Sequence, residues 1–183
     1  MFIQTEATPN PQTMKFLPGT TVLKTGTKFY TGNDRAKESP LASALFMVDG
    51  VNAVFLGSDF ITITKAEDYE WNTLKPHLLT TIMDFFVSGG EVMPEPKKPE
   101  STVSDDDSDI VREIKELIDT RVRPAVAMDG GDIVFHSFED GIVKLEMHGS
   151  CSGCPSSTAT LKMGIENMLK HYIPEVVAVE PVA

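Results

Sequence analysis

The sequence predicts an α+β protein made of two small α/β domains that are joined by a flexible acidic linker. The first observation is a break in composition: residues 88–108 read SGGEVMPEPKKPESTVSDDDS, with three prolines and hardly any large apolar side chain. The second is that both flanking segments mix strand-like alternation with helical spacing of apolar residues. The third is that no repeat relates the two halves. We therefore expect a first domain over 1–87, a linker over 88–108 and a second domain over 109–183.

The linker lacks the apolar surface whose burial would offset the entropy lost on ordering, so we expect it to be mobile. Stretched as polyproline it could reach on the order of 60 Å. The run Asp105–Asp107 either carries solvated charge or favours the start of the following helix through the helix dipole.

The composition narrows the class of protein and of partner. The chain has 183 residues, 41% hydrophobic and 23% charged, as in soluble globular proteins. Acidic residues outnumber basic ones by 27 to 16, which gives a formal net charge of -11. A general nucleic-acid binder needs a basic surface to displace counterions from phosphate, so we expect no nucleic-acid partner. No apolar run approaches the roughly 20 residues that span a bilayer, so we expect no membrane partner either.

The start of the chain and its cysteine count bear on the compartment. The first residues, MFIQTEATPNP, lack the basic and apolar regions of a secretory signal and the arginine-rich, acid-poor character of a mitochondrial presequence. We therefore expect a cytosolic protein or a mature form. Two cysteines are too few for a disulfide framework, which favours a reducing compartment.

The first segment begins with strand-like pieces and a short helix. Turn signals separate the expected extended pieces at Phe2–Thr5, Thr13–Leu17 and Thr20–Leu23. Ser39 followed by Pro40 predicts the N-cap and first residue of a helix. The apolar residues of that helix recur at helical spacing, at Leu41, Leu45 and Val48. Asp49 and Gly50 are expected to end it.

A hairpin and a long helix complete the first domain. The strands are expected at Val51–Leu56 and Phe60–Thr64, around a turn at residues 57–59. The closing helix has one apolar face, formed by Trp71, Leu74, Leu78, Ile82 and Phe85. Such a face predicts core rather than a ligand pocket. This segment has no cysteine, no phosphate-binding glycine loop and no nucleophile–base pair, and its one helical histidine, His77, predicts a structural or exposed role.

The second domain is expected to alternate helices and strands. Its first helix is marked by apolar residues at helical spacing: Ile110, Ile114, Leu117, Ile118 and Val122. We expect it to end before Pro124, and residues 129–132, read DGGD, to form a structural turn. The strands Ile133–Phe138 and Ile142–Met147 should form a hairpin. A last helix, marked by Leu161, Ile165, Met168, Leu169 and Tyr172, should precede a strand-like run over Val176–Val182.

Both cysteines lie in one stretch, GSCSGCPSS, directly after the second of these strands. A redox dithiol is one interpretation, because CxxC at a helix start lowers the pKa of its leading thiol. Against this interpretation, Ser152 and Gly153 lie between the cysteines and Pro155 follows the pair, which predicts a flexible loop and not the constrained turn usual in oxidoreductases. A hairpin also precedes the pair, where a thioredoxin fold would have a βαβ unit. A zinc site is a second interpretation, with His148 and His136 as the remaining ligands of a tetrahedron.

A shared iron–sulfur cluster is the third interpretation. Such clusters are held mostly by four cysteine thiolates, and one chain supplies two. A symmetric dimer would supply four, because a two-fold axis through the cluster brings both loops to one point. Gly149 and Gly153 would allow close backbone approach to sulfur, and Pro155 would begin a helix whose positive end suits an anionic cluster. From the residues alone, all three interpretations stay open.

The same residues carry a family resemblance. The second segment, in the run RVRPAVAMDGGDIVFHSFEDGIVKLEMHGSCSGCPSSTATLKMGIENML and the later IPEV, resembles the C-terminal domain of NifU-like (Nfu) iron–sulfur cluster carriers. The first segment resembles the N-terminal domain of two-domain members, in TEATPNPQTMKF, SPLASALF and DFITITK. The resemblance covers nearly everything except the linker, and the cysteine motif shows no departure from the family pattern.

The resemblance implies a carrier and not an enzyme. It implies a 4Fe–4S cluster, one per homodimer, that bridges two subunits and is delivered to apo iron–sulfur proteins late in cluster biogenesis. Cys151 and Cys154 are the positions that inherit the ligand role. Upstream cluster-assembly proteins are implied as further partners. Members occur in bacterial cytoplasm and in mitochondria, and the absent presequence favours the bacterial cytoplasm, with the mitochondrial matrix expected for a mature eukaryotic form.

Overall fold

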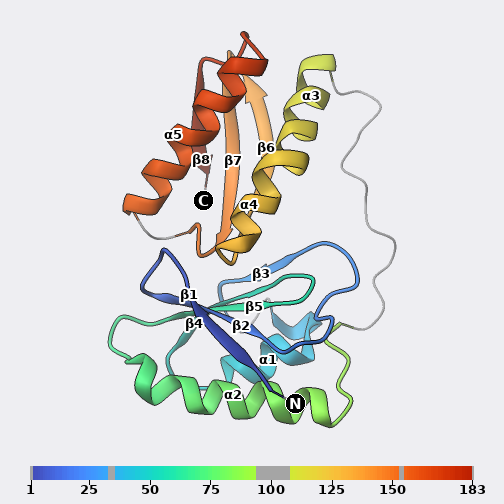
Figure 1. The fold of residues 1–183 in the computed structure, drawn as a ribbon, viewed down its shortest axis with the longest axis vertical. Coiled ribbons are helices and arrows are strands. Elements are labelled where there is room, and N and C mark those ends of the chain that lie inside the picture. Colours follow the sequence, from blue (N-terminus) through green and yellow to red (C-terminus); the bar gives the residue numbers. More distant parts are fainter. Residues whose placement is uncertain (1, 33–35, 94–107, 153–154, 183) are drawn as a thin grey trace. The chain divides into compact units, whose positions relative to one another are not determined.

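The computed structural model describes residues 2–32, 36–93, 108–152 and 155–182, without the side chains of residues 155–157. The chain divides into two compact units, Met1–Pro99 and Glu100–Ala183, and each is described by itself (Figure 1). Both combine helices with a β-sheet, so the α+β class predicted from the sequence is confirmed. Most of the expected linker, residues 94–107, lies outside the described residues, so its mobility stays a prediction.

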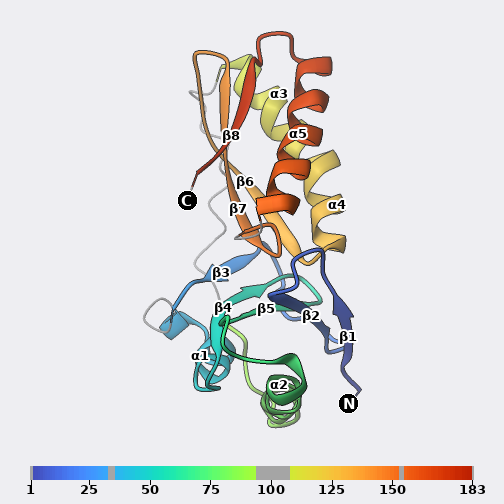
Figure 2. The same cartoon turned by 90° about the vertical axis from the view of Figure 1, so that its left-hand side faces the viewer.

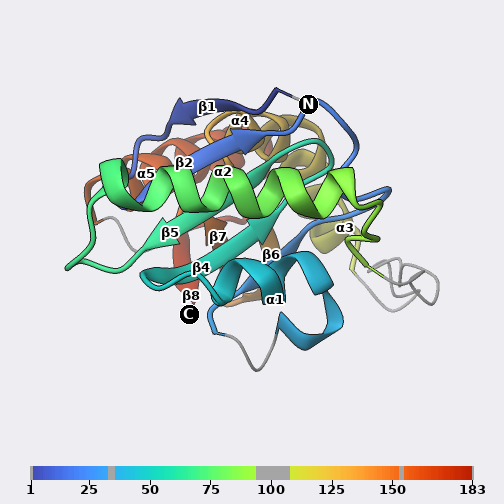
Figure 3. The ribbon, with the colours of Figure 1, turned by 90° about the horizontal axis from the view of Figure 1, so that it is seen from below.

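The first unit is a five-stranded antiparallel sheet in the order β1-β2-β5-β4-β3. Its strands are β1 (Gln4–Ala7), β2 (Thr13–Leu17), β3 (Lys28–Tyr30), β4 (Val51–Leu56) and β5 (Ile61–Lys65). Its helices are η1 (Ala36–Glu38), α1 (Pro40–Phe46) and α2 (Trp71–Val87). Both α1 and α2 lie on the same face of the sheet (Figures 2 and 3). The apolar face expected for the closing helix is confirmed as core, because Leu74, Leu78 and Ile82 are buried there.

One expected strand of this unit is wrong. Residues 20–23 form a loop, and the edge strand lies instead at β3, paired with β4. The adjacent side chains of Val22 and Leu23 are both buried in the core, which a strand with alternating faces does not allow. Their backbone N–H groups both donate to the carbonyl of Ser58, at 2.8 and 3.2 Å.

Ser39 joins the start of α1 to the segment that follows α2. Its hydroxyl accepts from the N–H of Ala42 at 3.2 Å, as the predicted N-cap should, and donates to the carbonyl of Val92 at 2.7 Å. Val92 is buried in the core of this unit, and the Tyr30 hydroxyl reaches the sulfur of Met93 at 3.9 Å. The chain after α2 therefore packs back on the first unit as far as Met93.

The second unit is a three-stranded sheet in the order β6-β7-β8. Its strands are β6 (Gly131–Glu139), β7 (Ile142–Gly149) and β8 (Ala178–Val182), with β6 antiparallel and β8 parallel to β7. Its helices are α3 (Asp109–Leu117), the π-helical turn η2 (Ile118–Val122), α4 (Arg123–Met128) and α5 (Pro155–Tyr172). The helices cover one face of the sheet (Figure 2).

The predicted alternation of β7 is confirmed. Val143, Leu145 and Met147 are buried against the helices, while the residues between them are partly exposed. The parallel strand β8 is held to the helix layer by Glu166, whose carboxylate accepts from the N–H of Val179 at 3.1 Å. The segment β7–α5–β8 is thus a crossover unit, and the cysteine stretch joins its first strand to its helix.

The expected helix end before Pro124 is wrong, because the helical path continues to Met128. A proline inside an α-helix removes one hydrogen bond and its ring crowds the carbonyl four residues earlier. Here the π-helical turn η2 precedes the proline, and the N–H of Arg123 donates to the carbonyl of Ile118, five residues back. This wider turn relieves the crowding and lets α4 carry its residues to the start of β6.

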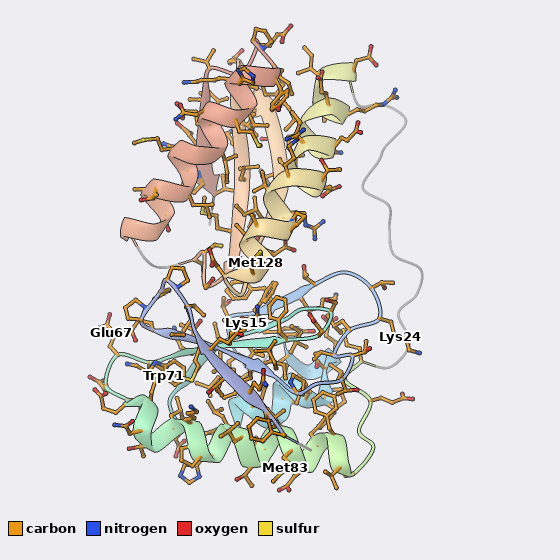
Figure 4. All side chains as sticks on the ribbon, in the orientation of Figure 1. Lys15, Lys24, Glu67, Trp71, Met83 and Met128 are labelled. Carbon is orange, nitrogen blue, oxygen red and sulfur yellow. The ribbon has the colours of Figure 1, made fainter. Side chains whose placement is uncertain are left out.

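We predict that Ser39→Ala destabilises the first unit by about 2 kcal/mol. The change removes a helix cap, worth about 1 kcal/mol, and leaves the buried carbonyl of Val92 without its donor, at about 1–3 kcal/mol. Trp71 is the only tryptophan of the chain and opens α2 (Figure 4), so its fluorescence in a urea titration reports on this unit. Thr80→Ala removes an exposed hydroxyl from α2 and should change stability by less than about 0.5 kcal/mol. Equal effects of the two changes would contradict the joining role of Ser39.

Candidate functional site

The cysteine stretch lies at the junction between β7 and α5. Cys151 follows β7 after one residue, and α5 begins at Pro155. Gly153 and Cys154 lie outside the described residues, so the place of Cys154 stays a prediction. The described part of the site consists of Cys151 and the residues around it.

The turn before β6 supports the loop that carries Cys151. The N–H of Ser150 donates to the carbonyl of Gly130 at 3.3 Å, and its hydroxyl donates to the carbonyl of Asp129 at 2.5 Å. Gly130 and Gly149 both have positive φ, at 78° and 64°, a backbone conformation that side chains with a Cβ rarely adopt. The two loops are thus fitted to one another through backbone groups, although 20 residues separate them in the sequence.

An ion pair that the sequence analysis missed fixes this turn. The guanidinium of Arg123 binds the carboxylate of Asp132 through two bonds, Nε to Oδ1 and Nη2 to Oδ2, each at 2.8 Å. Oδ1 also accepts from the N–H of Ile133 at 2.8 Å. Asp132 is buried, and a buried carboxylate is tolerated when its charge is paired in this way. The interpretation of residues 129–132 as a structural turn agrees with these contacts. The only sequence signal for Arg123 was its place before Pro124.

The thiol of Cys151 points into the core of the second unit. The residue is 5% exposed and belongs to the same apolar cluster as Ile133, Met147 and Ile165. A Cβ added at Gly131 would lie 2.5 Å from the Cys151 sulfur and 2.9 Å from the carbonyl oxygen of His148. Only a glycine at this position leaves room for the thiol.

The surroundings of the thiol disfavour its ionised form. Burial raises the pKa of the Cys151 thiol to about 11. A hydrogen bond with Ser150 lowers this pKa, and the negative charges of Asp129 and Asp132 raise it. Catalytic dithiols show the opposite shift, with the pKa of the leading thiol between about 3.5 and 7.5. In the described conformation Cys151 is therefore not an activated redox nucleophile.

The structure does not bring together the histidines of the zinc interpretation. His148 faces Asp132 across the β6–β7 pair, and its Nε2 lies 3.0 Å from the carboxylate of Glu146. His136 is exposed at an irregularity of β6. It lies four residues after Asp132, the strand partner of His148, which is about 13 Å along the strand at the usual rise per residue. Among the described residues, no group of three or more His, Cys, Asp and Glu side chains could hold a metal ion.

Comparison with known proteins gives two family matches. Residues 3–89 match the family described as "Scaffold protein Nfu/NifU N terminal", and residues 114–180 match the family described as "NifU-like domain". All of the chain aligns with the "NFU1 iron-sulfur cluster scaffold homolog, mitochondrial" of Homo sapiens, at 53% identity over 72% of that protein. It also aligns in full with the protein of the same description from Drosophila persimilis, at 56% identity over 65% of that protein.

The match to these relatives is partial on their side. The chain spans less than two thirds of the length of several relatives with this description, for example 62% of the one from Drosophila virilis. The solution structure of a NifU-like protein from Saccharomyces cerevisiae is similar at 26% identity with a TM-score of 0.48, over 52% of this chain and 87% of that one.

Within the described ranges, no helix has the length and apolar character needed to cross a membrane.

We predict that the Cys151 thiol of the folded chain ionises near pH 11. In a Cys154→Ser variant Cys151 is the only thiol, and the pH dependence of its alkylation by iodoacetamide, read by mass spectrometry, gives its pKa. The midpoint should lie near 11 in the folded chain and near 9.0 after unfolding in urea. A folded-state midpoint at or below 9 would contradict the buried position of the thiol.

The same shift has a consequence for stability. The folded-state pKa lies above the unfolded value, so the protonated thiol stabilises the fold below pH 9, and this contribution is lost as the pH rises from 9 to about 11. At about 1.4 kcal/mol for each tenfold change in ionisation, the loss is of the order of 2–3 kcal/mol.

Proposed function

This chain belongs to the Nfu family of iron–sulfur cluster scaffold proteins, and on that basis we propose that two copies hold one 4Fe–4S cluster and deliver it to apo iron–sulfur proteins. Cys151 and Cys154 of each copy are the proposed ligands. The cluster is the cargo of the protein. The observation that carries the proposal is the cysteine count: a four-thiolate site needs four thiols, and each chain has two, both in one loop.

The position of the loop supports the proposal. It directly precedes α5, a helix of 18 residues, and the N-terminal end of a helix carries partial positive charge. An anionic cluster is stabilised by such an end. Because both cysteines lie in one short loop, a two-fold axis beside this loop would bring four thiolates to one cluster without any other part of the chain.

Delivery would proceed by exchange of thiolates. Each acceptor thiol gives up its proton, binds an iron and displaces one cysteine of the carrier, which takes up a proton as it leaves. The iron and sulfide of the cluster keep their oxidation states, so no oxidant or reductant is consumed. The carrier is returned unchanged and only exchanges its iron–thiolate bonds with those of the acceptor, which is why we propose a scaffold and not an enzyme.

We propose that the protein delivers its cluster in mitochondria. The relatives from human and Drosophila are named mitochondrial, and the expectation of a bacterial cytoplasm finds no support among them. The proposed partners are a second copy of the chain, apo iron–sulfur acceptors and upstream cluster-assembly proteins. We also propose the three-part organisation 1–87, 88–108 and 109–183, in which residues 88–93 of the linker pack against the first domain. We propose that the first domain assists the recognition of partners.

We predict that anaerobic reconstitution of the full chain with iron and sulfide yields about two irons and two sulfides per chain, since four of each are shared by two chains. Sizing chromatography should show the cluster on a dimer. Cys151→Ser or Cys154→Ser should abolish both the cluster and the cluster-dependent shift to dimer, because each removes two of the four ligands from the assembly.

His148→Gln is the matched control for this experiment. The iron–sulfur proposal expects the variant to load as the unaltered chain does, whereas a site of two cysteines and two histidines would lose its metal. A monomer that binds only zinc would overturn the proposal. So would a chain that catalyses the reduction of disulfides with no cluster formed.

A further inference from the structure

The described position of Cys151 cannot be the position in which it binds a cluster. Its thiol is buried among apolar side chains of its own unit, and its sulfur lies where a side chain of Gly131 would be. A cluster shared by two chains has to meet its ligands at the surface of both. If the proposed function is right, on which this inference rests, Cys151 must turn outward before it can bind iron.

Among the described residues, two hydrogen bonds hold the backbone of Cys151 in the inward position, in addition to the hydrogen bond of its thiol with Ser150. Its N–H donates to the carbonyl of His148 at 3.4 Å, which is a long bond. Its carbonyl accepts from the hydroxyl of Thr158 at 3.2 Å. The second contact joins the loop to α5, so it is the one that would be broken if the loop moved relative to that helix.

The bond from Thr158 is not the usual bond of a helical threonine. Such hydroxyls commonly bond to the carbonyl three or four residues earlier in the same helix. Thr120 behaves in that way, with its hydroxyl 2.6 Å from the carbonyl of Glu116. The hydroxyl of Thr158 instead reaches back seven residues, beyond the start of α5 at Pro155, to the residue that carries the thiol.

We infer that Thr158 is a positioning residue that holds the apo chain in a closed state, with the Cys151 thiol sheltered against Gly131 until cluster loading releases it. This hydrogen bond is part-buried, and a single bond of this kind can be exchanged for water without unfolding the domain. The closed state would shield a ligand thiol from oxidation and from stray metal ions while no cluster is bound. Loading then consists of breaking this contact, turning the thiol outward and replacing its proton with iron.

The test measures the exposure of the thiol directly in the full-length chain. In the Cys154→Ser background, iodoacetamide alkylation of Cys151 is followed at fixed pH by mass spectrometry. Thr158→Val keeps the shape of the side chain and removes its hydroxyl, and we expect alkylation to be about fivefold faster, the factor for one ordinary hydrogen bond. Thr158→Ser retains a hydroxyl and should react at the unaltered rate. Thr120→Val is the matched control and should have no effect.

Gly131→Ala tests the sheltered position through a different contact. The added methyl would occupy the place of the sulfur, so the thiol should react faster even with Thr158 in place. Circular dichroism shows whether each variant is folded. An unchanged rate in a folded Thr158→Val variant would overturn the role of Thr158, as would an equal acceleration by Thr120→Val. An unchanged rate in a folded Gly131→Ala variant would overturn the sheltered position itself.

Cluster loading separates this inference from the proposed function. With both cysteines present, Thr158→Val should acquire its cluster several-fold faster than the unaltered chain and reach the same iron content. If the chain forms no cluster although Thr158→Val exposes the thiol, the proposed function fails and the positioning role stands. If the chain forms its cluster while Thr158→Val changes neither alkylation nor loading, the positioning role fails and the proposed function stands.

Discussion

The ion pair between Arg123 and the buried carboxylate of Asp132 is the interaction on which the geometry of the candidate site depends. It joins the first residue of α4 to the second residue of β6, so it fixes the position of this helix relative to the strand that follows it. The turn between these two residues provides the carbonyl groups of Asp129 and Gly130 that hold Ser150. The loop of Cys151 is thus built on a salt bridge in another part of the unit. Removal of the Arg123 guanidinium would take from the buried Asp132 carboxylate the charge that pairs with it, which is far more costly than the loss of an exposed pair.

The π-helical turn is the means by which this ion pair forms. Without it, Pro124 would end the helix, and Arg123 would lie in a loop with no fixed direction. With it, the path continues, and the guanidinium is placed between Asp132 and Asp119, whose carboxylate lies 3.1 Å from Nη1. Wider turns of this kind inside helices are frequent at functional sites. Here the turn acts at a distance, by placing the support for the loop and not a ligand.

The parts of the fold that sequence could predict are those whose signal is local. The alternation of β7, the cap at Ser39 and the hairpin of β4 and β5 depend on neighbouring residues, and each is found close to where the pattern indicates it. The strand expected at residues 20–23 failed because Val22 and Leu23 both turn to one core, a demand of tertiary packing. The inward thiol could not be predicted, since it depends on the approach of Gly131 across 20 residues of chain. The cysteine motif indicated which atoms could bind metal, but not that one of them is sheltered.

Sharing a site between two chains has a thermodynamic consequence that a site within one chain lacks. In the proposed carrier each chain contributes half of the ligands, so cluster binding and dimerisation are one equilibrium, and the bound cluster becomes less stable on dilution. An acceptor that offers all its thiolates on one chain needs no such association, so transfer to it gains the entropy that the dimer had lost. The sheltered position of the Cys151 thiol also favours transfer from the carrier to the acceptor. In the proposed cycle, the released Cys151 thiol returns to the buried position, where its raised pKa keeps it protonated and it does not compete for the iron. In the proposed carrier, weak retention therefore comes from the shared site, and protected return comes from the closed contact of one loop with the turn before β6.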